Sequence, residues 1–173
     1  MEVELIYAPG DAERRLLKRA VWATMGKVGE PIGLPTPELV RKVLAARHSP
    51  IRVLNFAFLF RGIPSNVSVH LCRHVHAVPF VQSLRNDRQS KLDGDLAPRN
   101  TPVNMIYYLN AEELMVVANK RLCQKASEKT RQAVQMMCLL AERAVPELQG
   151  LLVPMCEWCG GVCHEVEPCG RCE

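Results

Sequence analysis

The stretch from residue 73 to residue 85, RHVHAVPFVQSLR, concentrates side chains that bind anions. Arg73 and Arg85 each offer a planar fork of N–H donors that matches a phosphate or a carboxylate. Ser83 adds a hydroxyl group, and Arg121 adds a third guanidinium further along the chain. These residue types favour a site for a phosphate-bearing ligand. The alternative is a solvated turn whose polar side chains are satisfied by their neighbours and by water.

A second group of chemically active side chains lies near the end of the sequence, where five of the eight cysteines fall within the last 18 residues. Two C-x2-C pairs with nine residues between them can present four thiolates to Zn²⁺ in a tetrahedron. An iron–sulfur cluster and disulfide bonds are the alternatives. We expect the metal to stabilise a tail that is too short for a core of its own. The expected ligands are Cys156, Cys159, Cys169 and Cys172, with Cys163 and His164 as further candidates.

The bulk composition limits the class of protein and of partner. A length of 173 residues suffices for one domain with a real core, and 48% hydrophobic residues is ordinary for a soluble globular protein. The net charge of +4 suits a small anionic ligand or a weak contact with nucleic acid and selects neither, while the absence of a lysine/arginine run disfavours tracking along a polyanion. The N-terminal segment is acidic, unlike a signal peptide, and no apolar run reaches the ~18 residues of a membrane span. We therefore expect a cytoplasmic protein without a membrane partner.

Hydrophobic periodicity and breaker residues predict an α+β fold that must position these groups. Runs rich in β-branched and aromatic residues indicate strands, and apolar residues at helical spacing between caps and prolines indicate helices. The polar segment 86–102 is predicted to be a surface loop. We expect strands at 3–8 and 51–60 and helices at 11–25, 36–47 and 64–72.

The second half of the chain is predicted to hold one long helix. Asn110 with Glu113 three residues later is typical of a capping box, and apolar residues recur at helical spacing to about residue 145. Pro146 ends the pattern. We expect a main domain over residues 1–150 and a cysteine-rich tail over residues 151–173.

The order of these motifs resembles the flavin-dependent thymidylate synthases. Their signature is Arg-His-Arg followed after a short gap by Ser-x-Arg, and it stands here as RHVHAVPFVQSLR. Upstream, Ser49-Pro50 precedes an apolar strand and a short helix as in that family. Downstream, the spacing of Asn110 and Arg121 is similar to the family's Asn-Ala-Arg segment, which carries an arginine eleven residues after the asparagine. The resemblance covers roughly residues 45–150.

The resemblance implies a fold of antiparallel strands packed with helices, and an activity. The small zinc-knuckle-like tail predicted from the cysteine spacing has no counterpart in the family pattern. The family assembles as a homotetramer that shares active sites between subunits. Its FAD, reduced by NADPH, passes hydride to a pyrimidine deoxynucleotide monophosphate, and methylenetetrahydrofolate supplies the carbon. On this reading, the nucleotide is bound by Arg73, His70, Ser83, Arg85 and Arg121, with Arg121 and Arg73 also catalytic; FAD is contacted by Ser49, Arg73, His74 and Asn110.

Several positions depart from the family pattern. Val75 replaces the second arginine of Arg-His-Arg, Glu112 replaces the arginine of Asn-Ala-Arg, and Val116 replaces a later asparagine that contacts flavin. Val81 stands in place of a glutamate near the nucleotide. Lost charged hydrogen bonds, at about 1.5–3 kcal/mol each, predict weaker flavin binding. The alternative is therefore a non-catalytic nucleotide-binding or oligomeric module of the same fold that has lost its FAD site.

Overall fold

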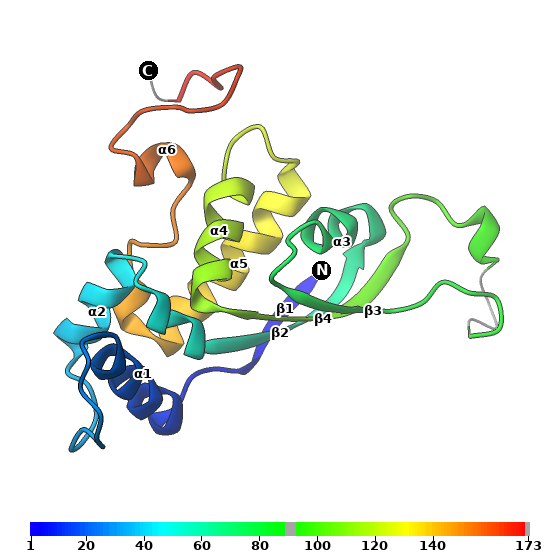
Figure 1. The fold of residues 1–173 in the computed structure, drawn as a ribbon. Coiled ribbons are helices and arrows are strands. Elements are labelled where there is room, and N and C mark those ends of the chain that lie inside the picture. The colour runs from blue at the N-terminus through cyan, green and yellow to red at the C-terminus, as the bar shows by residue number, and fades with distance from the viewer. Residues whose placement is uncertain (89–92, 172–173) are drawn as a thin grey trace.

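The fold is built on a four-stranded antiparallel sheet, with helices packed on one of its faces (Figure 1). The structure, a computed structural model, describes residues 1–88 and 93–171. The strand order is β1-β2-β4-β3, and each neighbouring pair is antiparallel. The predicted mixed fold with an antiparallel sheet is therefore confirmed. The strands are β1 (Glu2–Tyr7), β2 (Asn55–Pro64), β3 (Val78–Val81) and β4 (Pro102–Asn110).

The central strands β2 and β4 bury one face and leave the other less covered. In β4, buried and exposed residues alternate from Val103 to Leu109, as expected of a strand with one face on the core. Phe56, Phe58 and Phe60 of β2 point to the same buried face and are fully enclosed. The patterns described above predicted neither β3 nor β4, although the alternation in PVNMIYYLN is typical of a strand.

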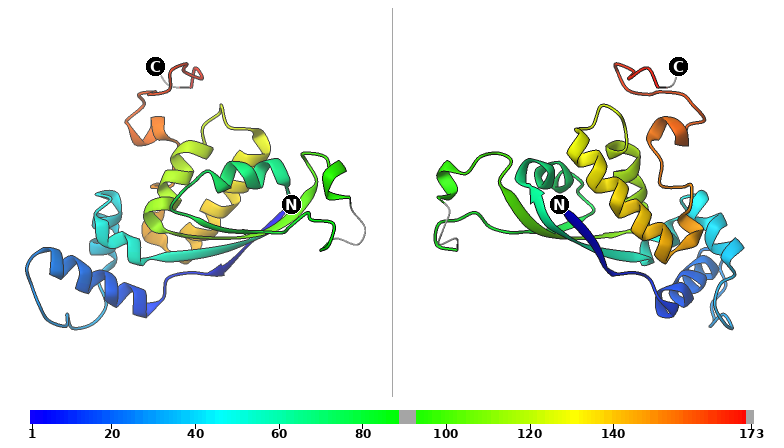
Figure 2. Two further views of the ribbon diagram at one scale, coloured as in Figure 1. Left: turned by 45° about the vertical axis from the view of Figure 1, so that its right-hand side comes forward. Right: turned by 180° about the vertical axis from the view of Figure 1, so that it is seen from behind.

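Three helices cover one face of the sheet, as both views in Figure 2 show. They are α3 (Ser65–Cys72), α4 (Ala111–Arg121) and α5 (Glu128–Ala144). The prediction of one helix to residue 145 is wrong, because α4 ends at Arg121 and α5 begins at Glu128. A straight helix of 35 residues would be roughly 50 Å long and could not keep its apolar stripe on so small a sheet. The chain instead turns back after α4, so that both halves pack on the sheet.

A second group of helices lies at the opposite end of the sheet from β3 (Figure 1). The predicted N-cap at Thr36 is confirmed, because its side chain accepts a hydrogen bond from the Leu39 N–H. The segment that precedes β2 forms a 3-10 turn rather than the start of the predicted strand. These elements are α1 (Asp11–Thr24), α2 (Pro37–Ala45) and the 3-10 turn η1 (Ser49–Val53); shorter turns are η2 (Gly94–Leu96) and η3 (Pro146–Leu148).

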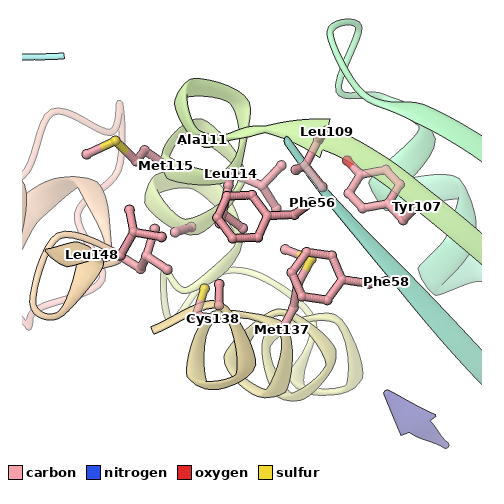
Figure 3. Close-up of a cluster of buried hydrophobic side chains, with 14 of the residues drawn as sticks. Phe56, Phe58, Tyr107, Leu109, Ala111, Leu114, Met115, Met137, Cys138 and Leu148 are labelled. Atoms are coloured by element: carbon pink, nitrogen blue, oxygen red, sulfur yellow. The ribbon is translucent and has the colours of Figure 1, made fainter. Parts of the chain in front are cut away.

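The core lies between the sheet and the helices α4 and α5 (Figure 3). Phe56 and Phe58 stack with ring centroids 6.3 Å apart, and Phe60 meets Tyr107 edge to face at 6.4 Å. Each fully buried aromatic ring of this kind contributes about 1.5–3 kcal/mol through removal of apolar surface from water. This core fixes α4 on the sheet, and α4 carries several of the predicted site residues.

The first residues of the predicted tail join this core. Leu151 and Leu152 are buried, and the short helix α6 (Met155–Trp158) lies beside α4. The Arg47 guanidinium stacks over the Trp158 ring at 4.1 Å from its centroid. No helix within residues 1–88 and 93–171 has both the length and the apolar character that crossing a membrane requires.

Candidate functional site

The polar residues predicted to bind a ligand meet where α3 ends beside α4. Arg73 follows the last residue of α3, and the chain then turns sharply toward β3 (Figure 1). Backbone hydrogen bonds from His74 N–H to Leu71 O, and from Ala77 N–H to His74 O, both 3.1 Å, fix this turn. The buried Tyr107 hydroxyl donates to Leu71 O at 3.1 Å and ties the same corner to β4.

At this corner, a buried imidazole bridges two side chains of α4. Arg121 Nε donates to His74 Nε2 at 3.0 Å, and His74 Nδ1 lies 3.5 Å from Glu113 Oε1. Glu113 and Arg121 are eight residues apart, so they share one face of the helix with Val117 between them. Both His74 and Glu113 are almost fully buried. The arrangement fixes the orientation of the Arg121 guanidinium.

The charge states in this group follow from its geometry. A guanidinium can only donate, so His74 Nε2 must accept, and the imidazole proton sits on Nδ1 toward Glu113. Burial, and secondly the Arg121 charge, lower the pKa of His74 from 6.5 to about 4. Burial raises the pKa of Glu113. The contact between His74 and Glu113 is therefore one of a neutral imidazole with a carboxyl group, not an ion pair at neutral pH.

Arg121 is further held by the end of α3. Its Nη2 donates to His70 O at 2.8 Å, and the His70 ring contacts the Thr130 hydroxyl of α5 at 2.8 Å. Burial lowers the pKa of Arg121, and the nearby Arg73 charge acts in the same direction. A guanidinium stays protonated despite such a shift. The structure thus brings together four predicted site residues: His70, Arg73, His74 and Arg121.

Ser83 and Arg85 lie apart from this group. They follow β3, on the segment that projects away from the body of the molecule in both views of Figure 2. Arg85 donates two hydrogen bonds of 3.0 Å to the carboxylate of Asp87, and Arg85 N–H donates to Ser83 Oγ at 3.3 Å. Asp95 adds a second carboxylate to the open cavity beside Arg85. A phosphate here must compete with carboxylates, although an exposed ion pair contributes only about 0–1 kcal/mol.

Ser49 and Asn110, both predicted to contact flavin, lie toward the start of α4. The Asn110 side chain accepts a hydrogen bond from Glu113 N–H at 3.0 Å and caps the helix. The eleven residues of α4 rise by roughly 16 Å, and this rise separates Asn110 from Arg121. Ser49 is exposed at the start of η1. The predicted flavin residues therefore divide between the two ends of α4.

The residues near Asn110 do not fit a flavin as the resemblance implies. Glu112 stands where the family has an arginine, and its carboxylate accepts hydrogen bonds from Nε and Nη2 of Arg52. The pair leaves no net positive charge for a pyrophosphate at this end of α4. The Asn110 side-chain oxygen is already used by the helix cap. Val75, in place of another arginine, is 84% exposed and offers only an apolar surface.

The predicted zinc site in the tail can be followed only for those of its cysteines that lie among the described residues. Among those residues, no group of three or more His, Cys, Asp or Glu side chains is arranged to hold a metal ion. Cys156 is buried, whereas Cys159, Cys163 and Cys169 are half-buried, and His164 is exposed. Cys172, the fourth predicted ligand, lies outside the described residues. The zinc site stays a prediction, as does the domain boundary at residue 150.

Comparison with known proteins finds this fold in solved structures that hold dUMP or 5-Br dUMP. No family model and no curated protein sequence matches the chain. Among solved structures, thymidylate synthase X of Helicobacter pylori with FAD and dUMP superposes with a TM-score of 0.67 at 17% identity, covering 88% of this chain and 97% of that one. The UMP/dUMP methylase PolB of Streptomyces cacaoi with 5-Br dUMP gives 0.67 at 16% identity, with coverage of 87% and 93%. The chain thus has the fold of the flavin-dependent thymidylate synthases.

Glu113 is the site residue that the sequence patterns did not identify as such. They assign it only to a capping box, a role in which its side chain would turn back to the helix start. The structure instead directs its carboxylate to His74. The available signal was the spacing of Glu113 and Arg121, which are eight residues apart and so lie on the same face of a helix. This spacing becomes informative only once a buried partner is known to face that side of α4.

Proposed function

We propose that this protein binds a pyrimidine deoxynucleotide monophosphate and acts on the base by one-carbon transfer, as an enzyme of the thymidylate synthase type. The observation that carries the proposal is Arg121, which is held by His74 and the His70 carbonyl in a chain with this fold. A preoriented, half-buried guanidinium is suited to bind a pyrimidine carbonyl and to stabilise negative charge that develops on it. Arg73, exposed beside it, is suited to an anionic group of the same ligand.

The proposed cofactors are treated separately because the residues support them unequally. FAD, NADPH and methylenetetrahydrofolate are proposed from the resemblance alone. The Glu112–Arg52 pair and the capping role of Asn110 oppose a flavin pyrophosphate in the position that the resemblance implies. We therefore assign no chemical step to the flavin. A cytoplasmic location and a structural zinc ion in the tail complete the proposal.

We further propose that the active form is a homo-oligomer, a tetramer by analogy with the family. Ser83 and Arg85 project from the body and lie apart from Arg121, so one chain does not gather all its predicted nucleotide ligands. The face of the sheet opposite the helices also exposes apolar side chains. Val78, Phe80, Ile106 and Tyr108 share this face in neighbouring positions of β3 and β4, and Phe80 is 61% exposed. In such an assembly one copy of the chain could cover this surface, while another copy brings its Arg85 to Arg121 on the helix side of the sheet.

A non-catalytic nucleotide-binding module of the same fold is the second candidate. It is favoured by the Glu112–Arg52 ion pair. Where the family has an arginine free to contact an anion, this chain has a glutamate whose charge is balanced by Arg52. Under this alternative the Arg121 corner still binds nucleotide. The two candidates differ in turnover and in flavin binding, and not in nucleotide affinity.

The test combines nucleotide binding with flavin binding on one preparation. Isothermal titration with dUMP should give a dissociation constant that the Arg121→Lys variant weakens about tenfold or more, because lysine keeps the charge but loses the fork. Arg143→Lys, exposed at the end of α5, is the matched control and should bind as the parent does. Absence of dUMP binding in the parent would reject both candidates. Binding without flavin uptake or turnover would select the non-catalytic one.

A further inference from the structure

We propose that a cavity between the end of α4 and the tail is a thiolate-bound metal site in which Cys123, from the main body of the protein, is a ligand. The cavity measures about 290 Å³. Its walls bring together cysteines that are far apart in sequence, and none of the C-x2-C spacings includes Cys123. The lining thiols are those of Cys123, Cys156, Cys163 and Cys169, with His164 beside them.

The lining of this cavity differs from the ligand set that the sequence spacing predicts. Cys159, the second cysteine of the first C-x2-C pair, is not part of the wall. Cys159 instead lies near Arg47, whose guanidinium stacks on the ring of Trp158, the last residue of α6. Cys123 takes the remaining place from the segment just after α4. Four cysteines are again available, and soft thiolate ligands select zinc or an iron–sulfur cluster.

Two ion pairs join the tail to the end of α4 and the segment after it, and the first of them lies in the cavity wall. Lys120 Nζ lies 3.3 Å from Glu165 Oε1, and Lys125 Nζ lies 3.4 Å from Glu167 Oε2. Lys120 and Glu165 also line the cavity. Both pairs are exposed and weak individually, so they orient the tail without fixing it. The four cysteines therefore line a common space between the tail and the end of α4.

The thiols line the cavity without converging on one point in the described residues. Metal binding must therefore draw the tail inward. The described residues 160–171 contain no helix or strand, so their backbone can adjust without breaking a regular hydrogen-bond ladder. A bound metal would then join the tail to α4 two residues beyond Arg121. This inference does not depend on the proposed nucleotide activity.

The test is metal analysis and cobalt substitution of the full-length reduced protein. Cys123→Ser should weaken metal binding about tenfold or more and remove about a quarter of the thiolate-to-cobalt absorption, as expected for one of four thiolates. Cys72→Ser is the matched control, because Cys72 is exposed at the end of α3 and does not line the cavity. Cys159→Ser should also leave the spectrum unchanged. Loss of the site in Cys159→Ser with full retention in Cys123→Ser would establish the sequence-based ligand set and overturn the proposal.

A second measurement needs no variant and so does not depend on the folding of Cys123→Ser. Alkylation of the native protein, read by mass spectrometry, should leave Cys123, Cys156, Cys163 and Cys169 protected until a chelator is added. Cys72 should react in both conditions. Zinc and an iron–sulfur cluster are distinguished by the metal found and by visible absorption, and either supports the site. A protein that binds neither metal, or whose tail cysteines form disulfides when purified, would refute it.

Discussion

Replacement of His74 by glutamine should remove a defined part of the acid sensitivity of the fold. In the native protein, burial and Arg121 hold the pKa of His74 at about 4, against 6.5 in the unfolded chain. Between these values the unfolded state binds a proton that the folded state does not, so stability rises with pH across this window. Within this window, each pH unit changes the free energy of unfolding by about 1.4 kcal/mol. From pH 6.5 to pH 4.5, His74 should therefore account for a loss of about 2–3 kcal/mol.

The groups around His74 decide how this experiment is built. Glutamine can accept from Arg121 through its side-chain oxygen, so the variant keeps the bond at 3.0 Å without a titrating group. Glu113 acts in the opposite sense, because its raised pKa adds stability as the pH falls. His74→Gln should therefore be measured in a Glu113→Gln background, where this contribution is absent. Arg73 and Arg121 keep their charges throughout the window.

Urea unfolding at several pH values between 4.5 and 7.5 provides the measurement. The free energy of unfolding of Glu113→Gln should fall by about 2–3 kcal/mol more than that of the double variant over the acidic part of this range. His48→Gln, at an exposed histidine outside the corner, is the matched control for a histidine-to-glutamine replacement. Parallel curves for the single and double variants would refute the assignment of a buried, neutral His74.

Three further predictions concern other parts of the molecule. Exchange of Glu112 and Arg52 should leave the free energy of unfolding close to that of the parent, because Arg52 is exposed and Glu112 is partly exposed. Glu112→Arg alone should strengthen FAD binding in a fluorescence titration, and equal FAD affinity for parent and variant would contradict our reading of this pair. Phe58→Ala should lower the free energy of unfolding by about 3–5 kcal/mol in urea, since it empties a fully buried position, and a loss under 1 kcal/mol would be inconsistent with this core. Gly94→Ala should raise proteolysis of the segment after β3, because a Cβ at this position would meet Leu84 O at 1.9 Å; cleavage at the parent rate would show that the segment accommodates the methyl group.

Sequence patterns predicted correctly those helices whose first turn is fixed by a capping residue next to it in the chain. Thr36 before a proline located α2 because an N-cap is satisfied within three residues. The break between α4 and α5 was missed, since apolar residues continue at helical spacing through residue 126 and periodicity cannot detect a chain that turns back. The position of that turn depends on the size of the sheet, which is a tertiary property. Ser127, which precedes α5 and contacts the Thr130 hydroxyl at 2.7 Å, was the overlooked local sign.

The candidate site could be predicted only as far as its residues lie in motifs. Arg73 and His74 were found in one motif and Arg121 in another, and the structure joins them through a hydrogen bond between chain positions 47 residues apart. Ser83 and Arg85 belong to the first motif but do not join the corner within one chain. A motif records residue types in order and carries no information on which subunit they serve. The separation of Arg85 from Arg121 is thus a property that sequence spacing could not show.

The two adjacent glutamates at the start of α4 have opposite consequences for function. Successive helical residues point about 100° apart, so Glu112 faces outward to Arg52, whereas Glu113 faces inward to His74. The outward glutamate neutralises a cation at the end of the helix where the resemblance implies flavin. The inward one supports the imidazole that orients Arg121 at the other end. The same short segment thus opposes the predicted cofactor contact and supports the arginine to which we assign the nucleotide.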